Sequence, residues 1–159
     1  MGDRANILIG GVNGGEFRGV YLYTHWSGTE LPLTLQDALK KQWRWDDEQY
    51  LARIVFCEMV KGVEMGETGY GISAVVGDGT GRVLKVDTTT QTVTHVQSGK
   101  AWTFTEYCEL SEDELLGGIG FTGAAMNEQQ DGYSGLFYFM LVIGIIGLVG
   151  FVAVAGSIP

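Results

Sequence analysis

The sequence predicts an α+β protein: a small antiparallel-sheet domain with two packed helices, followed by one C-terminal transmembrane helix. Short runs rich in β-branched and aromatic residues, separated by glycine-containing turns, indicate strands. Two stretches between these runs have helical periodicity and helix-start residues. The segment 135–156 is apolar throughout and carries no charged side chain.

The chain opens with a predicted hairpin. Asn6 to Ile9 and Gly19 to Thr24 are the two strands, and the second alternates apolar and polar residues with a period of two. The glycine-rich stretch 10–19, GGVNGGEFRG, is expected to be the loop between them.

Two helices follow the hairpin. The first is expected from about Leu33 to Gln42, because Pro32 suits a first turn. The second is expected to begin at Asp46, which forms a near capping box with Gln49, and to stop before Gly62. Its buried side is predicted to be Tyr50, Leu51, Ile54, Val55 and Cys57.

The pattern then changes to four short strands, which we expect to form an antiparallel meander over residues 71–76, 82–87, 91–96 and 101–106. His95 lies within the third of these strands and is expected at the surface or in a cross-strand contact. Ser111 and Glu114 form a capping box that predicts a short helix, ended by Gly117 and Gly118.

Three regions result: a soluble acidic head over 1–116, a glycine-rich polar linker over 117–134, and a single transmembrane helix over 135–156. With 19 acids against 10 bases, the net charge of −9 argues against nucleic acid as a partner. Cys57 and Cys108 are expected to be free, buried thiols.

The apolar segment 135–156 is about 33 Å long as a helix, enough to cross the roughly 30 Å hydrocarbon core of a bilayer. A buried core helix would be shorter and would carry a polar stripe. Gly144, Gly147 and Gly150 predict a close-packed face against transmembrane helices of other subunits. The first ten residues lack the apolar run of a secretory signal, so we expect a tail-anchored, single-pass membrane protein with its head in the cytoplasm.

Four segments carry a resemblance that covers about the first 107 residues. MGDRAN at the start, LYTHWSGTELP at 22–32, RWDDEQYLARIVFCEMV at 44–60 and TGYGIS at 68–73 resemble a set of small uncharacterised bacterial and phage proteins that begin MGDRAN. No activity is known for that family, so the resemblance implies none. The hydrophobic tail is an addition to the pattern.

Catalytic candidates are few. His25 is the best lone general base, with Cys57 or Cys108 as nucleophile and Asp46 or Asp47 as orienting group. A histidine in a loop beside a tryptophan is more often a structural hydrogen-bonding residue. The two histidines and two cysteines match no metal-ligand spacing, so no metal and no cofactor is expected.

Trp43, Arg44 and Trp45 lie between the two predicted helices and allow two interpretations. Tryptophan and arginine are favoured at binding hot spots, so the three residues are a candidate docking site. A hydrophobic staple for the second helix explains them equally well.

The sequence therefore favours a non-enzymatic structural or accessory subunit, whose head is held to the lipid bilayer within a larger assembly, either a cellular complex or a membrane-containing virion. One alternative is a membrane-tethered enzyme that uses the cysteine and histidine residues. Another is a soluble binding module with a hydrophobic docking tail.

Overall fold

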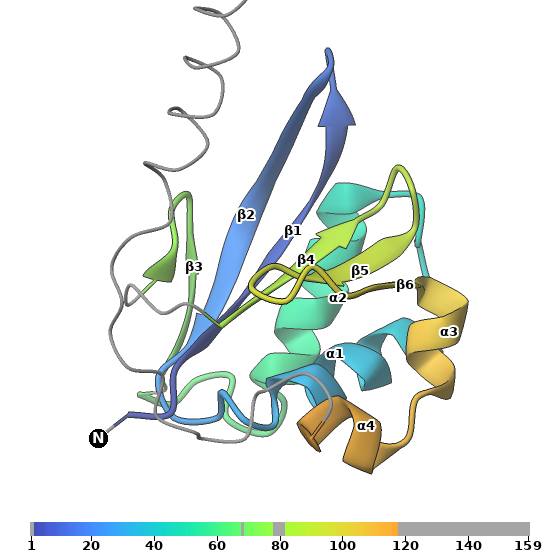
Figure 1. Ribbon diagram of the computed structural model, residues 1–159. Coiled ribbons are helices and arrows are strands. Elements are labelled where there is room, and N and C mark those ends of the chain that lie inside the picture. The colour runs from blue at the N-terminus through green and yellow to red at the C-terminus, as the bar shows by residue number, and fades with distance from the viewer. Residues whose placement is uncertain (1, 68, 78–81, 118–159) are drawn as a thin grey trace, which may run out of the picture. The chain divides into compact units, whose positions relative to one another are not determined.

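The computed structural model describes residues 2–67, 69–77 and 82–117, which form an α+β domain around one mixed sheet (Figure 1). Six strands lie in the order β3-β2-β1-β4-β5-β6. The strands are β1 (Ala5–Asn13), β2 (Glu16–Thr24), β3 (Tyr70–Ser73), β4 (Val83–Asp87), β5 (Thr92–His95) and β6 (Ala101–Thr103). The helices are α1 (Leu31–Lys40), α2 (Glu48–Met59), α3 (Phe104–Glu109) and α4 (Glu112–Gly117).

The opening hairpin is confirmed, but its loop is much shorter than the expected stretch 10–19. Only Gly14 and Gly15 connect β1 to β2, and both have positive φ angles, 63° and 85°. A two-residue hairpin turn of this kind requires left-handed backbone at both positions, which glycine adopts without steric cost. The other glycines of the stretch belong to the strands, so each strand is nine residues long.

The predicted all-antiparallel sheet and its four-stranded meander are wrong. β1 pairs in parallel with β4, in a register that sets Ile7 opposite Leu84, while β3 pairs with β2 at one edge of the sheet. Parallel neighbours need a long crossover, and here it contains both α1 and α2. Only β4, β5 and β6 form the expected antiparallel series.

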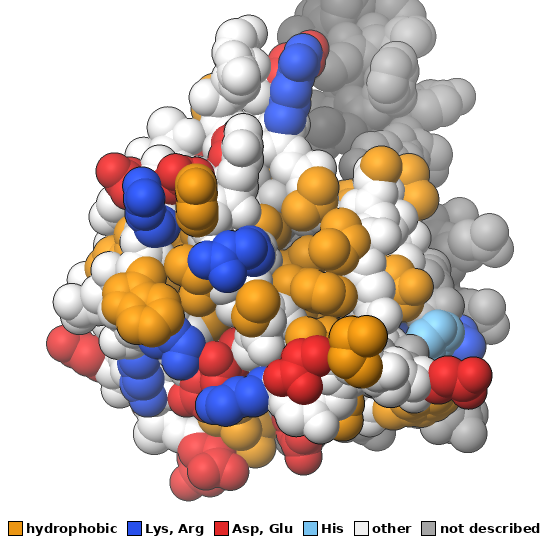
Figure 2. Space-filling model, turned by 180° about the vertical axis from the view of Figure 1, so that it is seen from behind, with side chains coloured by type: hydrophobic (Ala, Val, Ile, Leu, Met, Phe, Trp, Pro, Cys, Tyr) orange, Lys and Arg blue, Asp and Glu red, His pale blue; other side chains and the backbone are white. Residues whose placement is uncertain are grey.

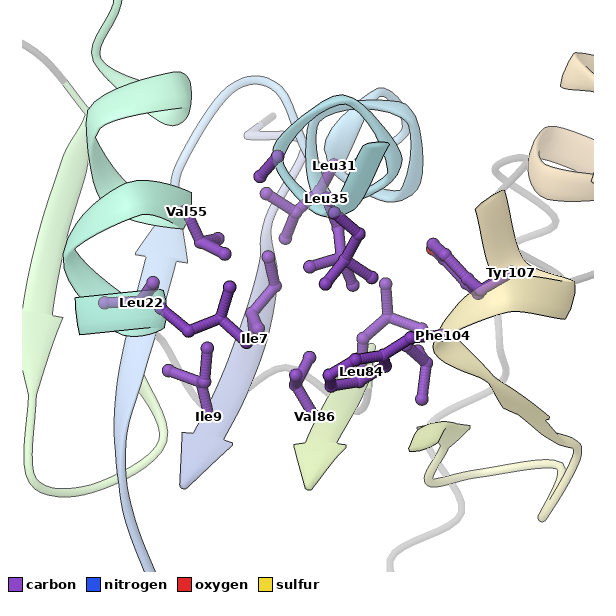
Figure 3. Close-up of a cluster of buried hydrophobic side chains, with 14 of the residues drawn as sticks. Ile7, Ile9, Leu22, Leu31, Leu35, Val55, Leu84, Val86, Phe104 and Tyr107 are labelled. Carbon is purple, nitrogen blue, oxygen red and sulfur yellow. The ribbon is translucent and has the colours of Figure 1, made fainter. Parts of the chain in front are cut away.

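One face of the sheet forms the hydrophobic core with the helices (Figure 3). Ile7 and Ile9 of β1 and Leu84 and Val86 of β4 alternate with residues on the opposite face, as the strand period requires. The helices contribute the other side of the core: Leu31, Leu35, Ala38, Leu39, Leu51, Val55, Phe104, Tyr107 and Leu115.

The two predicted helices are confirmed with shifted ends. α1 begins at Leu31, with Pro32 in its first turn, and α2 is capped by Asp47 rather than Asp46: the Asp47 carboxylate accepts a hydrogen bond from the backbone N–H of Tyr50. The buried side of α2 is Leu51, Ile54, Val55 and Met59. Tyr50 and Cys57 are exposed, which corrects their predicted burial: at about 100° per residue they lie more than about 100° around the helix from the centre of this buried side.

The second half of the last predicted strand, 101–106, is helical in the structure. β6 ends at Thr103, which caps α3 through a reciprocal capping box with Glu106, so the chain turns out of the sheet there. The short helix predicted from Ser111 is confirmed as α4, and Ser111 and Glu114 cap it in the same way.

The predicted linker 117–134 lies beyond the described residues apart from Gly117, and the predicted transmembrane helix, with Gly144, Gly147 and Gly150, lies wholly beyond them. Within 2–67, 69–77 and 82–117, every helix is too short or too polar to span a bilayer.

Candidate functional site

In the connection between α1 and α2, the two tryptophans of the Trp43-Arg44-Trp45 cluster point in opposite directions. Trp45 turns inward: its ring meets Phe104 edge-on at a centroid distance of 5.4 Å, and its indole Nε1 donates a hydrogen bond to the carbonyl of Leu39 at 3.0 Å. Trp45 therefore packs against the core beside the end of α1.

Trp43 points the other way and is 61% exposed. The two residues beside it, Gln42 and Arg44, have positive φ angles of 56° and 55°, a left-handed conformation that costs non-glycine residues about 1–2 kcal/mol. Strain of this kind concentrates at functional sites. The turn thus displays Trp43 on the surface while its neighbour Trp45 enters the core.

Cationic side chains lie on the exposed aromatic rings around this turn. The guanidinium carbon of Arg44 is 4.7 Å from the centre of the Tyr50 ring and that of Arg53 is 5.9 Å from it, while the Lys41 ammonium is 5.8 Å from the Trp43 ring. Each contact is a cation–π interaction.

We define the Trp43 surface as the side chains on and around this turn: Lys41, Gln42, Trp43, Arg44, Tyr50, Arg53 and Ile54. All but Lys41 line an open depression of about 520 Å³. Figure 2, a view from the side opposite to Figure 1, shows Lys and Arg side chains lying among exposed hydrophobic ones.

Two residues of the Trp43 surface, Lys41 and Arg44, form ion pairs with acidic residues of α2 and of its N-cap. Lys41 lies 3.0 Å from a Glu58 oxygen, and hydrogen bonds from Lys61 and Lys41 hold the pKa of Glu58 below its usual value. Arg44 and Asp47 are 3.8 Å apart, with Arg44 largely exposed and Asp47 partly exposed, a geometry that contributes little. Arg53 makes no ion pair with any residue that the structure describes.

The surroundings of His25, Cys57 and Cys108 do not favour the predicted catalytic pairing of the histidine with a cysteine. His25 follows β2; its ring contacts Tyr23 and Trp26, and its backbone N–H bonds to the carbonyl of Gly69. Cys57 is exposed on α2, and Cys108, in α3, is half-buried, so the prediction that both thiols are buried is wrong for Cys57. Burial raises the pKa of Cys108, which opposes formation of a thiolate nucleophile.

His95 is buried, so of the two predicted alternatives the structure agrees with the cross-strand contact and not with the surface position. Its ring lies on the core face of β5, opposite Leu84, and its Nδ1 is 2.7 Å from the Ser98 hydroxyl.

A second depression, of about 450 Å³, surrounds the start of α2 and is lined by Asp46, Asp47, Glu48, Gln49, Thr88 and Thr89. It is acidic, yet no group of three or more His, Cys, Asp or Glu side chains among the described residues is arranged to hold a metal ion.

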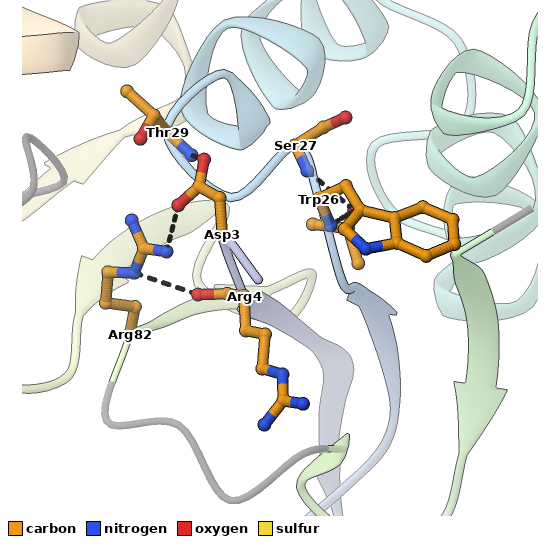
Figure 4. Close-up of polar contacts among 7 residues, drawn as sticks. Asp3, Arg4, Trp26, Ser27, Thr29 and Arg82 are labelled. Atoms are coloured by element: carbon orange, nitrogen blue, oxygen red, sulfur yellow. Dashed lines mark hydrogen bonds and ion pairs between the residues drawn. The ribbon is translucent and has the colours of Figure 1, made fainter. Parts of the chain in front are cut away.

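The MGDRAN segment and the loop after β2 are joined by polar contacts (Figure 4). The Asp3 carboxylate accepts a hydrogen bond from the Thr29 backbone N–H at 2.7 Å and pairs with Arg82, whose Nε also donates to the Arg4 carbonyl. Asn6 bonds through both of its amide atoms to the backbone of Gly77. These residues therefore fix the fold, and their roles are structural.

Tyr50 and Arg53, like Lys41, Gln42 and Ile54, belong to the Trp43 surface but are not among the docking residues that the sequence predicts. The sequence places Tyr50 and Arg53 within the second predicted helix, with Tyr50 on its buried side. The available signal was their three-residue spacing, which places them on one helix face beside the Trp-Arg-Trp turn. No protein-family model matches the chain, and no curated protein or solved structure is significantly similar to it.

Proposed function

We propose that this chain is a non-enzymatic accessory subunit of a membrane protein assembly, and that its head docks on a partner protein through the Trp43 surface. The observation that carries the proposal is the exposed tryptophan held out by a strained turn, beside a tyrosine flanked by two arginines. Tryptophan, tyrosine and arginine are the residues most enriched at interface hot spots. The end of α1 accounts for the left-handed backbone of Gln42, but no helix end accounts for that of Arg44.

The anchor belongs to the proposal on sequence grounds. Thirteen of the 22 residues in 135–156 are Leu, Ile, Val or Phe, and Gly144, Gly147 and Gly150 would let another helix approach closely. The proposed topology is a single span with the head in the cytoplasm. The resemblance to bacterial and phage proteins is compatible with a cellular complex or a virion that contains a membrane.

Two measurements test the proposal. Alkaline carbonate extraction of membranes from cells that make the full chain should leave it in the membrane fraction. A photo-reactive amino acid at position 43 should crosslink the chain to another subunit in native membranes. Position 96 is the matched control, because Val96 is also exposed, at 49%, but lies in the turn after β5.

Release of the chain by carbonate would contradict the proposed transmembrane anchor. Equal crosslinking from positions 43 and 96, or none from either, would overturn docking through the Trp43 surface.

A further inference from the structure

The two arginines of the Trp43 surface converge on one ring. Both guanidinium carbons lie within 6 Å of the centre of the Tyr50 ring, so one short segment of a partner can contact both. Carboxylates two residues apart on an extended segment are separated by on the order of 7 Å, a suitable spacing for such a pair. Stacking on an aromatic ring leaves the guanidinium edge free to donate two parallel hydrogen bonds to a carboxylate.

Both arginines also remain able to bind further carboxylates. Arg53 has no ion-pair partner among the residues that the structure describes, and the Arg44 side chain is 59% exposed with only a long contact to Asp47. Both arginines line the same depression as Tyr50 and Ile54, which offers apolar contact to one side chain. Charge and shape together fit an acidic segment with an apolar anchor.

The surrounding charges argue against an extended anionic surface as the occupant. Residues 37–61 hold five bases, Lys40, Lys41, Arg44, Arg53 and Lys61, and five acids, Asp37, Asp46, Asp47, Glu48 and Glu58. The region therefore has no net charge, and a bilayer of anionic lipids or a nucleic acid would bring its phosphates against these acids. Discrete carboxylates can be placed directly on Arg44 and Arg53, and Asp47, 3.8 Å from Arg44, is the one acid of the described residues that pairs with either arginine.

We propose that the Trp43 surface binds a carboxylate-bearing segment of the partner protein, with acidic side chains on Arg44 and Arg53 and one apolar side chain in the depression between them. This inference rests on the proposed function and names the chemistry of the partner. The carboxylates supply specificity, because an amide at the same position forms weaker hydrogen bonds and carries no charge.

The test measures binding of fluorescent 12-residue peptides to the full chain in a mild non-ionic detergent. One set has a central leucine flanked by four Asp or Glu residues, and the matched set replaces every acid with Asn or Gln. We expect the acidic peptides to bind at least about tenfold more tightly, and the R44Q/R53Q variant to lose this difference. The R18Q variant should keep it, because Arg18 is an exposed arginine on β2 that pairs with Glu16.

A W43A variant should weaken both peptide sets alike, since it removes apolar contact and no charge. Equal binding of the acidic and amide peptides, no binding of either, or an equal loss in R18Q would overturn the inference. Binding to vesicles of anionic phosphatidylglycerol through Arg44 and Arg53, without binding of acidic peptides, would assign the surface to lipid instead. Crosslinking from position 43 without a preference for acidic peptides would reject this inference and leave the proposed function standing.

Discussion

At the scale of single residues, the connection between α1 and α2 is stabilised on one side and strained on the other. Trp45 is held by the core and by its bond to the Leu39 carbonyl, whereas Gln42 and Arg44 occupy a backbone region that favours glycine. Gln42 follows the end of α1, where its N–H bonds back to the Leu39 carbonyl at 2.9 Å. This is the position at which helices most often place glycine.

Replacement of Gln42 by glycine should therefore stabilise the protein, by about 0.5–1 kcal/mol, because relief of the left-handed strain exceeds the extra entropy of the unfolded chain. The matched control is Asp37→Gly at an exposed position inside α1, which should lose about 1 kcal/mol. Urea unfolding of both variants measures the change. A loss of stability in Q42G would show that the glutamine side chain makes a contribution larger than the backbone strain.

His95 should make stability depend on pH. Its side chain is buried, and this burial lowers its pKa from the ordinary value of 6.5. Above pH 6.5 the ring is neutral in both the folded and the unfolded chain. Below it the unfolded chain takes up a proton that the folded chain resists, so the free energy of unfolding falls as the pH falls.

The measurement is chemical unfolding at pH 7.5 and pH 5.5, compared with the variant His95→Gln, which cannot titrate there. The wild-type protein should lose more stability across this interval than the variant. The same loss in both would assign the pH dependence to other groups.

At the scale of elements, the sequence predicts those features that depend on neighbouring residues. The α1 and α2 periodicity, the Ser111–Glu114 capping box and the hairpin all follow from local spacing, and the structure confirms them. Strand order depends on pairing between distant segments, and the predicted place of β3 in a meander is wrong. The Trp43 surface was predicted in part, because Trp43 and Arg44 are conspicuous in sequence while Tyr50 and Arg53 acquire their role only through the turn before them.

α3 is the exception, because its start has a local helix signal although the sequence pattern predicts a strand there. Thr103 and Glu106 have the same spacing as the box that correctly predicted α4, but the aromatic residues around them favoured a strand. Thr103→Ala should destabilise the protein by about 1 kcal/mol, since it removes the acceptor for the Glu106 N–H. Thr105→Ala, inside the same helix, should change stability by less than about 0.5 kcal/mol. Equal effects in thermal unfolding would mean that the box does not hold α3.

At the scale of the whole head, contacts between distant segments make one structural unit of the described residues. Asp3 and Arg4 bind Arg82, and Asn6 binds Gly77, so the start of the chain is fixed to the segments around β3 and β4. The Gln36 side chain of α1 donates to backbone carbonyls of Tyr107 and Leu110, more than 70 residues further along the chain. Contacts made by both the first and the last described segments therefore hold the predicted acidic head together.

Leu84 tests whether this unit unfolds as a whole. It is fully buried in β4, between Ile7 of β1 and His95 of β5, so Leu84→Ala should cost about 2–5 kcal/mol through lost burial and the cavity left behind. Ile72→Ala on β3 is the control: Ile72 is 58% exposed, and its loss should cost less than about 0.5 kcal/mol. Because Trp45 and Trp102 pack on α3, tryptophan fluorescence reports in part on that helix, whereas far-UV circular dichroism reports on helices throughout the chain. Both signals should shift together in the full chain carrying L84A, since a single core unfolds cooperatively. Two separate transitions would mean that the β4–β6 side, with α3, folds independently of the hairpin side.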